Sequence, residues 1–361
     1  MKYIDEYRDK KIVQKLVEQI RIISKKQVAF MEVCGGHTMS IQKFGIPSLI
    51  PSTIKLLSGP GCPVCVTDRK YIDQAIAYCR LSNVIITTFG DLIRVPGSTS
   101  TLDIEKANGA DIRIVYSSLE AIKIAEQNPD KRVIFLAIGF ETTAPGTAAA
   151  IIDANTKKIN NFYVYSAHKV MPPAMSALID EGVNINGYMS PGHVSAITGS
   201  EIYKDIADKY GLAVVISGFE PVDLLQSIYM LVKQVEENDP KVEIQYKRVV
   251  CEKGNPKALE IIDKVFEPRD DWWRGLGVLN SSGLGIRDKY STFDAEKNIK
   301  VDVEPTLEDK ACICGSILKG LNTPKDCRLF GKACTPVNPI GACMVSNEGA
   351  CAAYYKYNNN E

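Results

Sequence analysis

The residues of this chain best suited to chemistry are its eleven cysteines, six of which lie close together near the C-terminus. In a reduced, cytosolic protein, clustered cysteines bind metal more often than they form disulfides. Four fit the pattern C-x14-C-x6-C-x16-C, which in a loop-rich segment favours an iron–sulfur cluster over zinc, whose ligands tend to come as close C-x2-C pairs. Spacing alone does not select four ligands from Cys312, Cys314, Cys327, Cys334, Cys343 and Cys351.

A second candidate is Cys34, which lies in the stretch MEVCGGHT at residues 31–38. The cysteine follows a predicted buried strand, and two glycines after it allow another backbone or a ligand to approach closely. We expect the N-terminus of a following helix to lower the pKa of this thiol, which would make it a nucleophile or a metal ligand. His37 is near enough in sequence to act as its base or hydrogen-bond partner. The alternative is a small buried cysteine in a tight turn.

A third candidate is the pair Cys62 and Cys65 in the stretch SGPGCPVCVT at residues 58–67. Two cysteines separated by two residues on a strand-to-helix turn can close a disulfide or hold a metal, and the intervening Pro63 fixes the backbone. The oxidised and reduced forms would then store two electrons. An apolar turn has no need of paired thiols, so a purely structural interpretation of this motif is weak.

The histidines and a few acidic residues are further candidates for a cleft. All three histidines sit in loops flanked by Gly, Pro or Ala at predicted strand ends, which favours a cleft position over a purely structural one. Several acids follow other predicted strands, where helix caps and first-turn acids are an equally good interpretation. These residues are His37, His168, His193, Asp91, Glu141, Glu220 and Asp223.

Composition narrows the class of partner. The 361 residues include 43 Lys and Arg and 43 Asp and Glu, so the net charge is zero and gives no electrostatic case for nucleic acid or a membrane surface. Apolar runs are shorter than a bilayer-spanning helix requires, and the first residues show no apolar signal core. We therefore expect a soluble cytoplasmic protein, monomeric in isolation, that binds protein partners or small ligands.

Short β-rich runs alternate with helical stretches along most of the chain, which predicts parallel α/β sheets. An opening helix is expected over residues 9–25. Strands are predicted at 28–33, 54–57, 84–88, 112–116 and 133–138, then at 162–165, 187–189, 213–216 and 242–250.

The two sets of strands share sequence landmarks. An offset of 131 residues maps His37 onto His168, Pro60-Gly61 onto Pro191-Gly192, and Cys62 onto His193. We therefore predict two duplicated, Rossmann-like parallel-sheet domains with polar loops at the C-terminal ends of their strands, where open sheets bind ligands. The predicted domains span residues 1–140 and 141–265, and a small C-terminal iron–sulfur domain spans 266–361. Metal stabilises this third domain, because it has few apolar residues.

Taken together, the motifs resemble one family, HypD, the iron–sulfur accessory protein of [NiFe]-hydrogenase maturation. The matching stretches run in order over nearly the whole chain, and jointly they are highly specific. They are EVCGGHT at 32–38, GPGCPVC at 59–65, TFGD at 88–91, GFETT at 139–143, SAHK at 166–169, PGHV at 191–194, GFEP at 218–221 and DCRLFGKAC at 326–334.

The resemblance implies a function and its partners. Together with a small HypC-like chaperone, the protein would hold an iron ion while two cyanides and one carbon monoxide are attached. The cyanide would come from a HypE-like protein that carries it as a thiocyanate, and the finished Fe(CN)2CO unit would pass to the hydrogenase large subunit. Such a protein is an assembly scaffold with redox capability rather than a conventional turnover enzyme.

The resemblance also implies roles for individual residues. Cys34 would ligate the nascent iron, since a soft thiolate suits iron(II) that carries cyanide and carbonyl. Cys62 and Cys65 would act as a thiol–disulfide pair in the same cleft, fed by a [4Fe-4S] cluster, and His37 would be a nearby proton donor or supporting residue. The family pattern favours Cys312, Cys327, Cys334 and Cys351 as cluster ligands, with Cys314 and Cys343 as alternates.

Two other functions fit the same residues. One is a free-standing, iron–sulfur-dependent thiol–disulfide oxidoreductase that acts on a protein substrate. The other is a zinc-stabilised binding module with no redox role.

Overall fold

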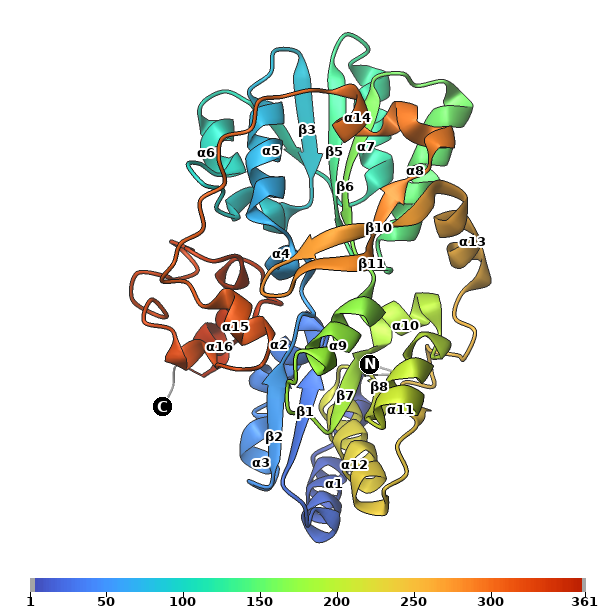
Figure 1. The fold of residues 1–361 in the computed structure, drawn as a ribbon, viewed down its shortest axis with the longest axis vertical. Coiled ribbons are helices and arrows are strands. Elements are labelled where there is room, and N and C mark those ends of the chain that lie inside the picture. Colours follow the sequence, from blue (N-terminus) through green and yellow to red (C-terminus); the bar gives the residue numbers. More distant parts are fainter. Residues whose placement is uncertain (1–3, 359–361) are drawn as a thin grey trace.

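Two α/β lobes and a cysteine-rich C-terminal segment make up the protein, shown as a computed structural model that describes residues 4–358 (Figure 1). Each lobe contains one parallel sheet, with strand order β2-β1-β7-β8-β9 in lobe A and β4-β3-β5-β6 in lobe B. The predicted fold class is confirmed. The strands are β1 (Val28–Glu32), β2 (Ile54–Ser58), β3 (Val84–Thr88), β4 (Asp111–Ile114), β5 (Arg132–Gly139), β6 (Phe162–His168), β7 (Gly187–Pro191), β8 (Ala213–Ser217) and β9 (Val242–Ile244).

Helices cover both sheets and are placed by ordinary capping and amphipathicity. Asp9 accepts hydrogen bonds from the backbone N–H groups of Lys11 and Ile12, so the opening helix begins at Lys10, close to its predicted start. The helices of lobe A are α1 (Lys10–Ile23), α2 (Gly35–Lys43), α3 (Ile46–Leu49), α10 (Gly192–Thr198), α11 (Lys204–Tyr210) and α12 (Pro221–Glu237), and those of lobe B are α5 (Arg69–Cys79), α6 (Leu102–Ala107), α7 (Ser118–Gln127) and α8 (Ala144–Lys157).

Connecting elements run between the lobes. The one-turn helix α4 (Pro63–Val66) follows β2 where the chain first leaves lobe A, and α9 (Met171–Asp180) follows β6 where it returns. Helix α13 (Pro256–Val265) packs on α8, and α14 (Ala295–Asn298) contacts β6. Short 3-10 helices occupy Asp5–Tyr7, Gly90–Arg94, Glu201–Tyr203, Asp288–Phe293, Pro324–Asp326 and Ala342–Met344.

The predicted boundary at residue 140 does not separate the two sheets. Strand β1 pairs with β7, so residues 28–58 share a sheet with residues 187–244, while lobe B occupies the intervening residues 84–168. A boundary at 140 would cut lobe B between β5 and α8. Alternating strand and helix patterns show where strands lie but not which sheet each joins, which is why the sequence misplaced this division.

The predicted boundary at residue 266 also falls in the wrong place. An antiparallel hairpin of β10 (Phe266–Trp273) and β11 (Gly277–Ile286) lies across the middle of the molecule and contacts β6 and α9 (Figure 1). The cysteine-rich part proper begins near Cys312 and contains α15 (Cys314–Leu318) and α16 (Ala350–Tyr357). The predicted strand 242–250 is also too long. It ends at Ile244, because the N–H groups of Gln245 and Tyr246 both donate to the Ile216 carbonyl.

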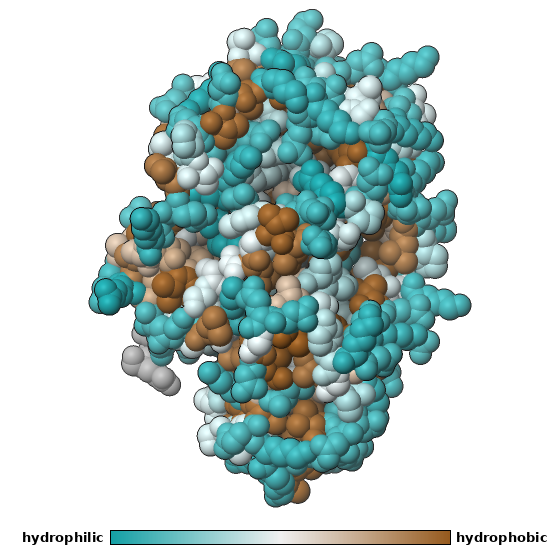
Figure 2. All heavy atoms as spheres, viewed as in Figure 1, coloured by the Kyte–Doolittle hydropathy of each residue, from teal (hydrophilic) through white to brown (hydrophobic). Residues whose placement is uncertain are grey.

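The apolar side chains are buried on the strands that alternate with helices along the sequence. Strands β3, β7 and β8 are buried at every position, as parallel strands covered on both faces are expected to be. On the face shown in Figure 2, hydrophilic residues cover the two ends and hydrophobic residues gather along the middle. Within residues 4–358, no helix combines the length and apolarity needed to cross a bilayer.

Candidate functional site

The two sheets point the carboxyl ends of their strands at one cavity between the lobes. It has a volume of about 530 Å³ and is lined by residues that follow β1, β2 and β7 in lobe A and β3 and β5 in lobe B. Open α/β sheets bind ligands at these strand ends. We call it the Cys34 cavity. Its polar and ionisable lining includes Cys34, Asp91, Thr142, Thr143, His193 and Glu348.

Cys34 is the N-cap residue of α2, as predicted, but its environment differs from the prediction. Burial, with a smaller contribution from the nearby charge of Glu348, raises the pKa of the Cys34 thiol to about 12, although the backbone N–H groups of His37 and Gly36 act to lower it. The expected lowering of this pKa was therefore wrong. The helix N-terminus is present, but the free-energy cost of removing the thiolate from water exceeds the stabilisation that one short helix provides.

The turns that carry Cys34 and Cys62 lie against each other, as expected of adjacent strand ends. Glu32 and Ser58 are paired at the ends of β1 and β2, and the N–H of Gly35 donates to the Gly61 carbonyl at 2.9 Å. A Cβ atom on Gly61 would lie 2.1 Å from the backbone nitrogen of Cys34. Only glycine therefore permits this approach of the two turns.

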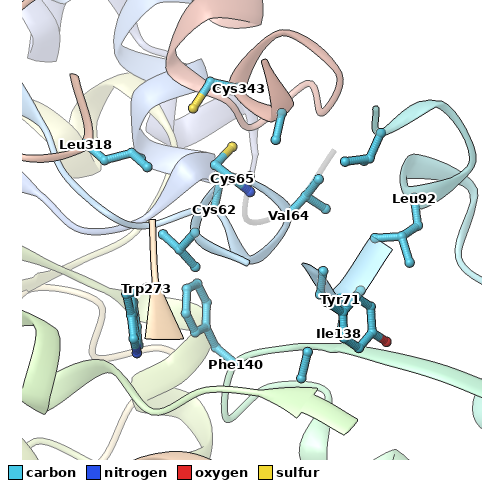
Figure 3. Packing of buried hydrophobic residues seen from close by; sticks show 14 of the residues in the cluster. Cys62, Val64, Cys65, Tyr71, Leu92, Ile138, Phe140, Trp273, Leu318 and Cys343 are labelled. Carbon is cyan, nitrogen blue, oxygen red and sulfur yellow. Dashed lines mark hydrogen bonds between the residues drawn. The ribbon is translucent and has the colours of Figure 1, made fainter. Parts of the chain in front are cut away.

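Cys62 and Cys65 nevertheless do not line the Cys34 cavity. Cys62 caps the one-turn helix α4, and its sulfur accepts a hydrogen bond from the N–H of Cys65 at 3.3 Å. Both thiols are buried and free. The sulfur of Cys65 points towards that of Cys343 (Figure 3), and the two thiols are close enough to shift each other's pKa, upwards for Cys65 and downwards for Cys343. The pair therefore faces the C-terminal segment, on the far side of its turn from the cavity.

Five C-terminal cysteines surround a second, small cavity, which we call the cysteine cavity. Its apolar lining includes Ile317, Leu329, Phe330 and Met344, and its cysteines are Cys312, Cys314, Cys327, Cys334 and Cys351. The four predicted cluster ligands are thus brought together, while Cys343 stands outside this cavity, between Cys65 and Cys314.

The thiols around the cysteine cavity are of the type that holds an iron–sulfur cluster. Within the described residues no three Cys, His, Asp or Glu side chains are placed to hold one metal ion, and Cys314 interacts with Cys312, Cys343 and Cys351. The N–H of Ile340 donates to the Cys334 sulfur at 3.3 Å, a contact typical of cluster ligands. The sulfurs of Cys312 and Cys314 are only 3.3 Å apart.

The three histidines occupy different positions. His193 lines the Cys34 cavity, whereas His37 is fully buried behind it and its Nε2–H faces the carbonyls of Ser217 and Gly218 at 3.2 and 3.1 Å. Phe219 stacks on both rings. Burial lowers the pKa of His37 to about 4, which favours the neutral imidazole. His168 is buried against Thr147 in lobe B, outside the cavity.

The acidic candidates divide in the same way. Asp91 and Glu348 line the Cys34 cavity, and Ser346 donates a hydrogen bond to Asp91 at 2.8 Å. The other acids have structural partners: Glu141 accepts from the Met171 N–H at the start of α9, Glu220 pairs with Arg8, and Asp223 pairs with Arg248.

Sequence reasoning missed Glu348 and the hairpin residue Arg274. Glu348 lies between the C-terminal cysteines in sequence, yet it packs against Gly35 and faces the cavity. Arg274 follows Trp273 in a stretch with no periodic pattern, and its guanidinium donates to the carbonyls of Cys65 and Thr67. In the sequence, only the Glu-Gly pair at 348–349 pointed to Glu348, and no local pattern pointed to Arg274.

Comparison with known proteins gives one consistent result. A family model described as HypD, hydrogenase formation hypA family, matches residues 11–358. The chain is similar to the hydrogenase maturation factors HypD of Azotobacter vinelandii (45% identical, 99% of this chain and 97% of the relative) and of Cupriavidus necator (43%, with the same shares). It is similar as well to a putative hydrogenase expression/formation protein of Methanocaldococcus jannaschii (45% identical, 97% of this chain and 98% of the relative).

Proposed function

This chain belongs to the HypD family of hydrogenase maturation factors, and from that premise we propose that it is the scaffold on which an Fe(CN)2CO unit is assembled. The iron ion and its cyanide and carbonyl ligands are the substrate. A HypC-like chaperone supplies a second thiolate, a HypE-like carrier delivers cyanide, and the hydrogenase large subunit receives the product.

One observation carries this proposal: Cys34 is the only cysteine among the described residues lining the cavity between the lobes. A cavity of about 530 Å³ has room for an iron ion with small diatomic ligands and part of a partner protein. The residue Cys34 is 8% exposed and lines the cavity, so iron bound there would be shielded from bulk water but reachable through the cavity. A soft thiolate suits low-spin iron(II).

The chain's own residues prepare this position. Cys34 loses its proton when it binds iron, because only the thiolate is a ligand. The carboxyl group of Glu348 is close enough to raise the pKa of the Cys34 thiol, so it lies where that proton is released. Asp91 and His193 present polar groups on the opposite walls of the cavity, where they can hydrogen-bond to cyanide nitrogens.

The cysteine cavity fits a [4Fe-4S] cluster, which would be held by Cys327, Cys334, Cys351 and one of Cys312 and Cys314. When bound, such a cluster supplies single electrons. The neighbouring thiols of Cys65 and Cys343 connect α4 with the segment that surrounds this cavity. This neighbourhood supports a route by which such a cluster would exchange electrons with the dithiol of Cys62 and Cys65.

Infrared spectroscopy tests the proposal. The chain would be co-expressed with the other maturation proteins, purified anaerobically with its chaperone and examined for cyanide and carbonyl stretching bands. We expect the bands in the wild type and their loss in C34A. C251A is the matched control, since Cys251 is exposed and hydrogen-bonded only to the nearby Gly254 carbonyl, and it should keep the bands. Absence of bands from the wild-type complex would refute the scaffold function.

A thiol–disulfide oxidoreductase is the second candidate, favoured by the contact between Cys65 and Cys343. It is the weaker of the two, because Cys62 is 3% and Cys65 0% exposed and a protein substrate would have to reach them through a closed turn. Reduction of a disulfide-containing protein by C34A at the wild-type rate, with no infrared bands in either form, would favour this candidate over the scaffold.

A further inference from the structure

Arg274 occupies the turn between β10 and β11 and holds the end of the helix that carries the cysteine pair. Its Nε donates to the Cys65 carbonyl and its Nη2 to the Thr67 carbonyl, both at 2.9 Å, and its backbone N–H donates to the Val66 carbonyl at 2.8 Å. These three consecutive carbonyls are groups that a helix end leaves without partners. Arg274 is therefore the C-terminal cap of α4.

The same guanidinium is tied to the cysteine-rich segment. Its Nη1 contacts both oxygens of Glu308, at 3.0 and 3.2 Å, and Glu308 precedes Cys312 by four residues. A second buried arginine, Arg69, donates to the carbonyls of Leu307 and Ile340. We call Arg274, Arg69 and Glu308 the arginine clamp. It joins α4, the hairpin and the segment that surrounds the cysteine cavity.

Helix α4 depends on such a clamp because it has only four residues. One turn of helix is not stable by itself, so its geometry is set by what holds its ends. Cys62 lies at one end and Cys65 within its last turn, which places their separation under the control of the cap. A lysine would not replace Arg274, since one ammonium group cannot bond two carbonyls and a carboxylate in a planar fork.

We propose that Arg274 is a positioning residue that sets the dithiol–disulfide equilibrium of Cys62 and Cys65 by fixing α4 against the cysteine-rich segment. This inference deepens the proposed function and rests on it. On oxidation, the two thiols lose two protons and two electrons as one S–S bond forms. In the test below the electrons pass to oxidised dithiothreitol, which becomes the reduced dithiol. A loosened α4 holds the two sulfurs together less well, so the disulfide becomes less favourable.

The equilibrium can be measured on this pair alone. The full-length chain, purified anaerobically, is equilibrated in mixtures of oxidised and reduced dithiothreitol, alkylated and digested with trypsin. Cleavage after Lys55 and Arg69 releases residues 56–69, whose only cysteines are Cys62 and Cys65. We expect R274M to shift the equilibrium towards the dithiol at least tenfold, about 30 mV for a two-electron couple. R274K should shift it in the same direction.

Matched variants separate positioning from charge and from general loss of stability. R287M removes an arginine that follows the same hairpin but pairs on the surface with Asp263, and it should leave the equilibrium within twofold of wild type. An R274K equilibrium equal to wild type would show that charge alone matters and overturn the proposal. A folded R274M at the wild-type equilibrium would overturn it as well.

If R274M does not fold, the variants E308Q and R274K together test the proposal. E308Q leaves the arginine in place but removes its anchor, and we expect a shift of at least threefold towards the dithiol. Wild-type equilibria in both variants would refute the positioning role. The measurement needs no iron, cyanide or partner protein, so its outcome is independent of the infrared experiment. If the wild-type complex shows no infrared bands but R274M still shifts the dithiol–disulfide equilibrium, only the scaffold function is overturned.

Discussion

Two neighbouring turns with the same local design face opposite ways. The Cys34 turn and the Cys62 turn each follow a strand of the same sheet and cap a helix, and their backbones touch at Gly61. Cys34 faces the cavity between the lobes, whereas Cys62 and Cys65 lie away from it, with Cys65 facing Cys343. Under the proposed function, the thiol that would bind iron and the thiols that would carry electrons thus lie on neighbouring turns but face different surroundings.

The largest expected difference between the two regions is their dependence on bound metal. C334A should lose the iron–sulfur cluster, seen as loss of the absorption shoulder near about 400 nm and of most of the iron, because Cys334 lines the cysteine cavity. C34A should keep both, since Cys34 belongs to the other cavity. C343A is the control within the segment and should retain the cluster. Loss of the cluster in C34A would break the separation of the two sites.

The contact between the two turns should be very sensitive to a single methyl group. G61A would force a Cβ atom against the backbone of Cys34, where no flexible side chain can move aside. We expect the free energy of unfolding to fall by about 3 kcal/mol or more, measured by urea denaturation. G146A adds the same methyl group in helix α8, where the nearest atom is 3.6 Å away, and should be close to neutral. Equal effects of both changes would contradict this account of the contact.

The cysteines of the two turns should also differ in how fast they are alkylated. The raised pKa of about 12 for the Cys34 thiol means that its thiolate fraction grows about tenfold per pH unit. Alkylation of Cys34 should therefore accelerate about a hundredfold between pH 7 and pH 9, followed by mass spectrometry of tryptic peptides. The peptide with Cys62 and Cys65 should stay largely unlabelled, while the exposed Cys251 reports that the reagent is active. A Cys34 rate that levels off below pH 9 would contradict the raised pKa.

The smallest expected effect concerns the buried His168 of lobe B, which does not itself line the Cys34 cavity. Burial lowers the pKa of His168 to about 4, below its unfolded value of about 6.5, so the unfolded state binds the proton more readily. The stability that this group contributes is present above pH 6.5 and is lost as the pH falls towards 4. H168Q should reduce the loss of unfolding free energy between pH 7 and pH 5 by about 1 to 2 kcal/mol. An unchanged pH profile would show that other groups govern the acid sensitivity.

Local patterns were enough to predict the strands of the two parallel sheets, apart from the length of β9, and the opening helix and thiol-bearing turns. They did not reveal the hairpin of β10 and β11. Cys34 and the cysteine pair follow β1 and β2 as expected, because a strand followed by glycines and a helix is encoded within about ten residues. Long-range pairing was not predictable in the same way. Nothing in residues 28–58 indicates that β1 pairs with β7, so the lobe boundary was misplaced.

The sequence identified residues of the candidate site but not how their side chains are oriented or how close together they lie. Spacing brought out the six C-terminal cysteines, yet only the packing of Gly341 against Cys312 and Cys314 shows how closely these two stand. The pKa of Cys34 depends on burial between two lobes and on Glu348, which lies more than three hundred residues away in sequence. Desolvation and long-range contacts of this kind leave no local signature.

The last helix has a consequence for the order of events in the cell. Helix α16 packs on α2, and Asn358 donates a hydrogen bond to Gln42 at 2.7 Å, so the wall of the Cys34 cavity that contains Glu348 comes from a segment synthesised long after Cys34. A ribosome-bound chain that has folded only its lobes would present Cys34 with one wall missing. A chain that stops before this segment would lack both the cysteine cavity and the Glu348 wall of the position proposed for iron.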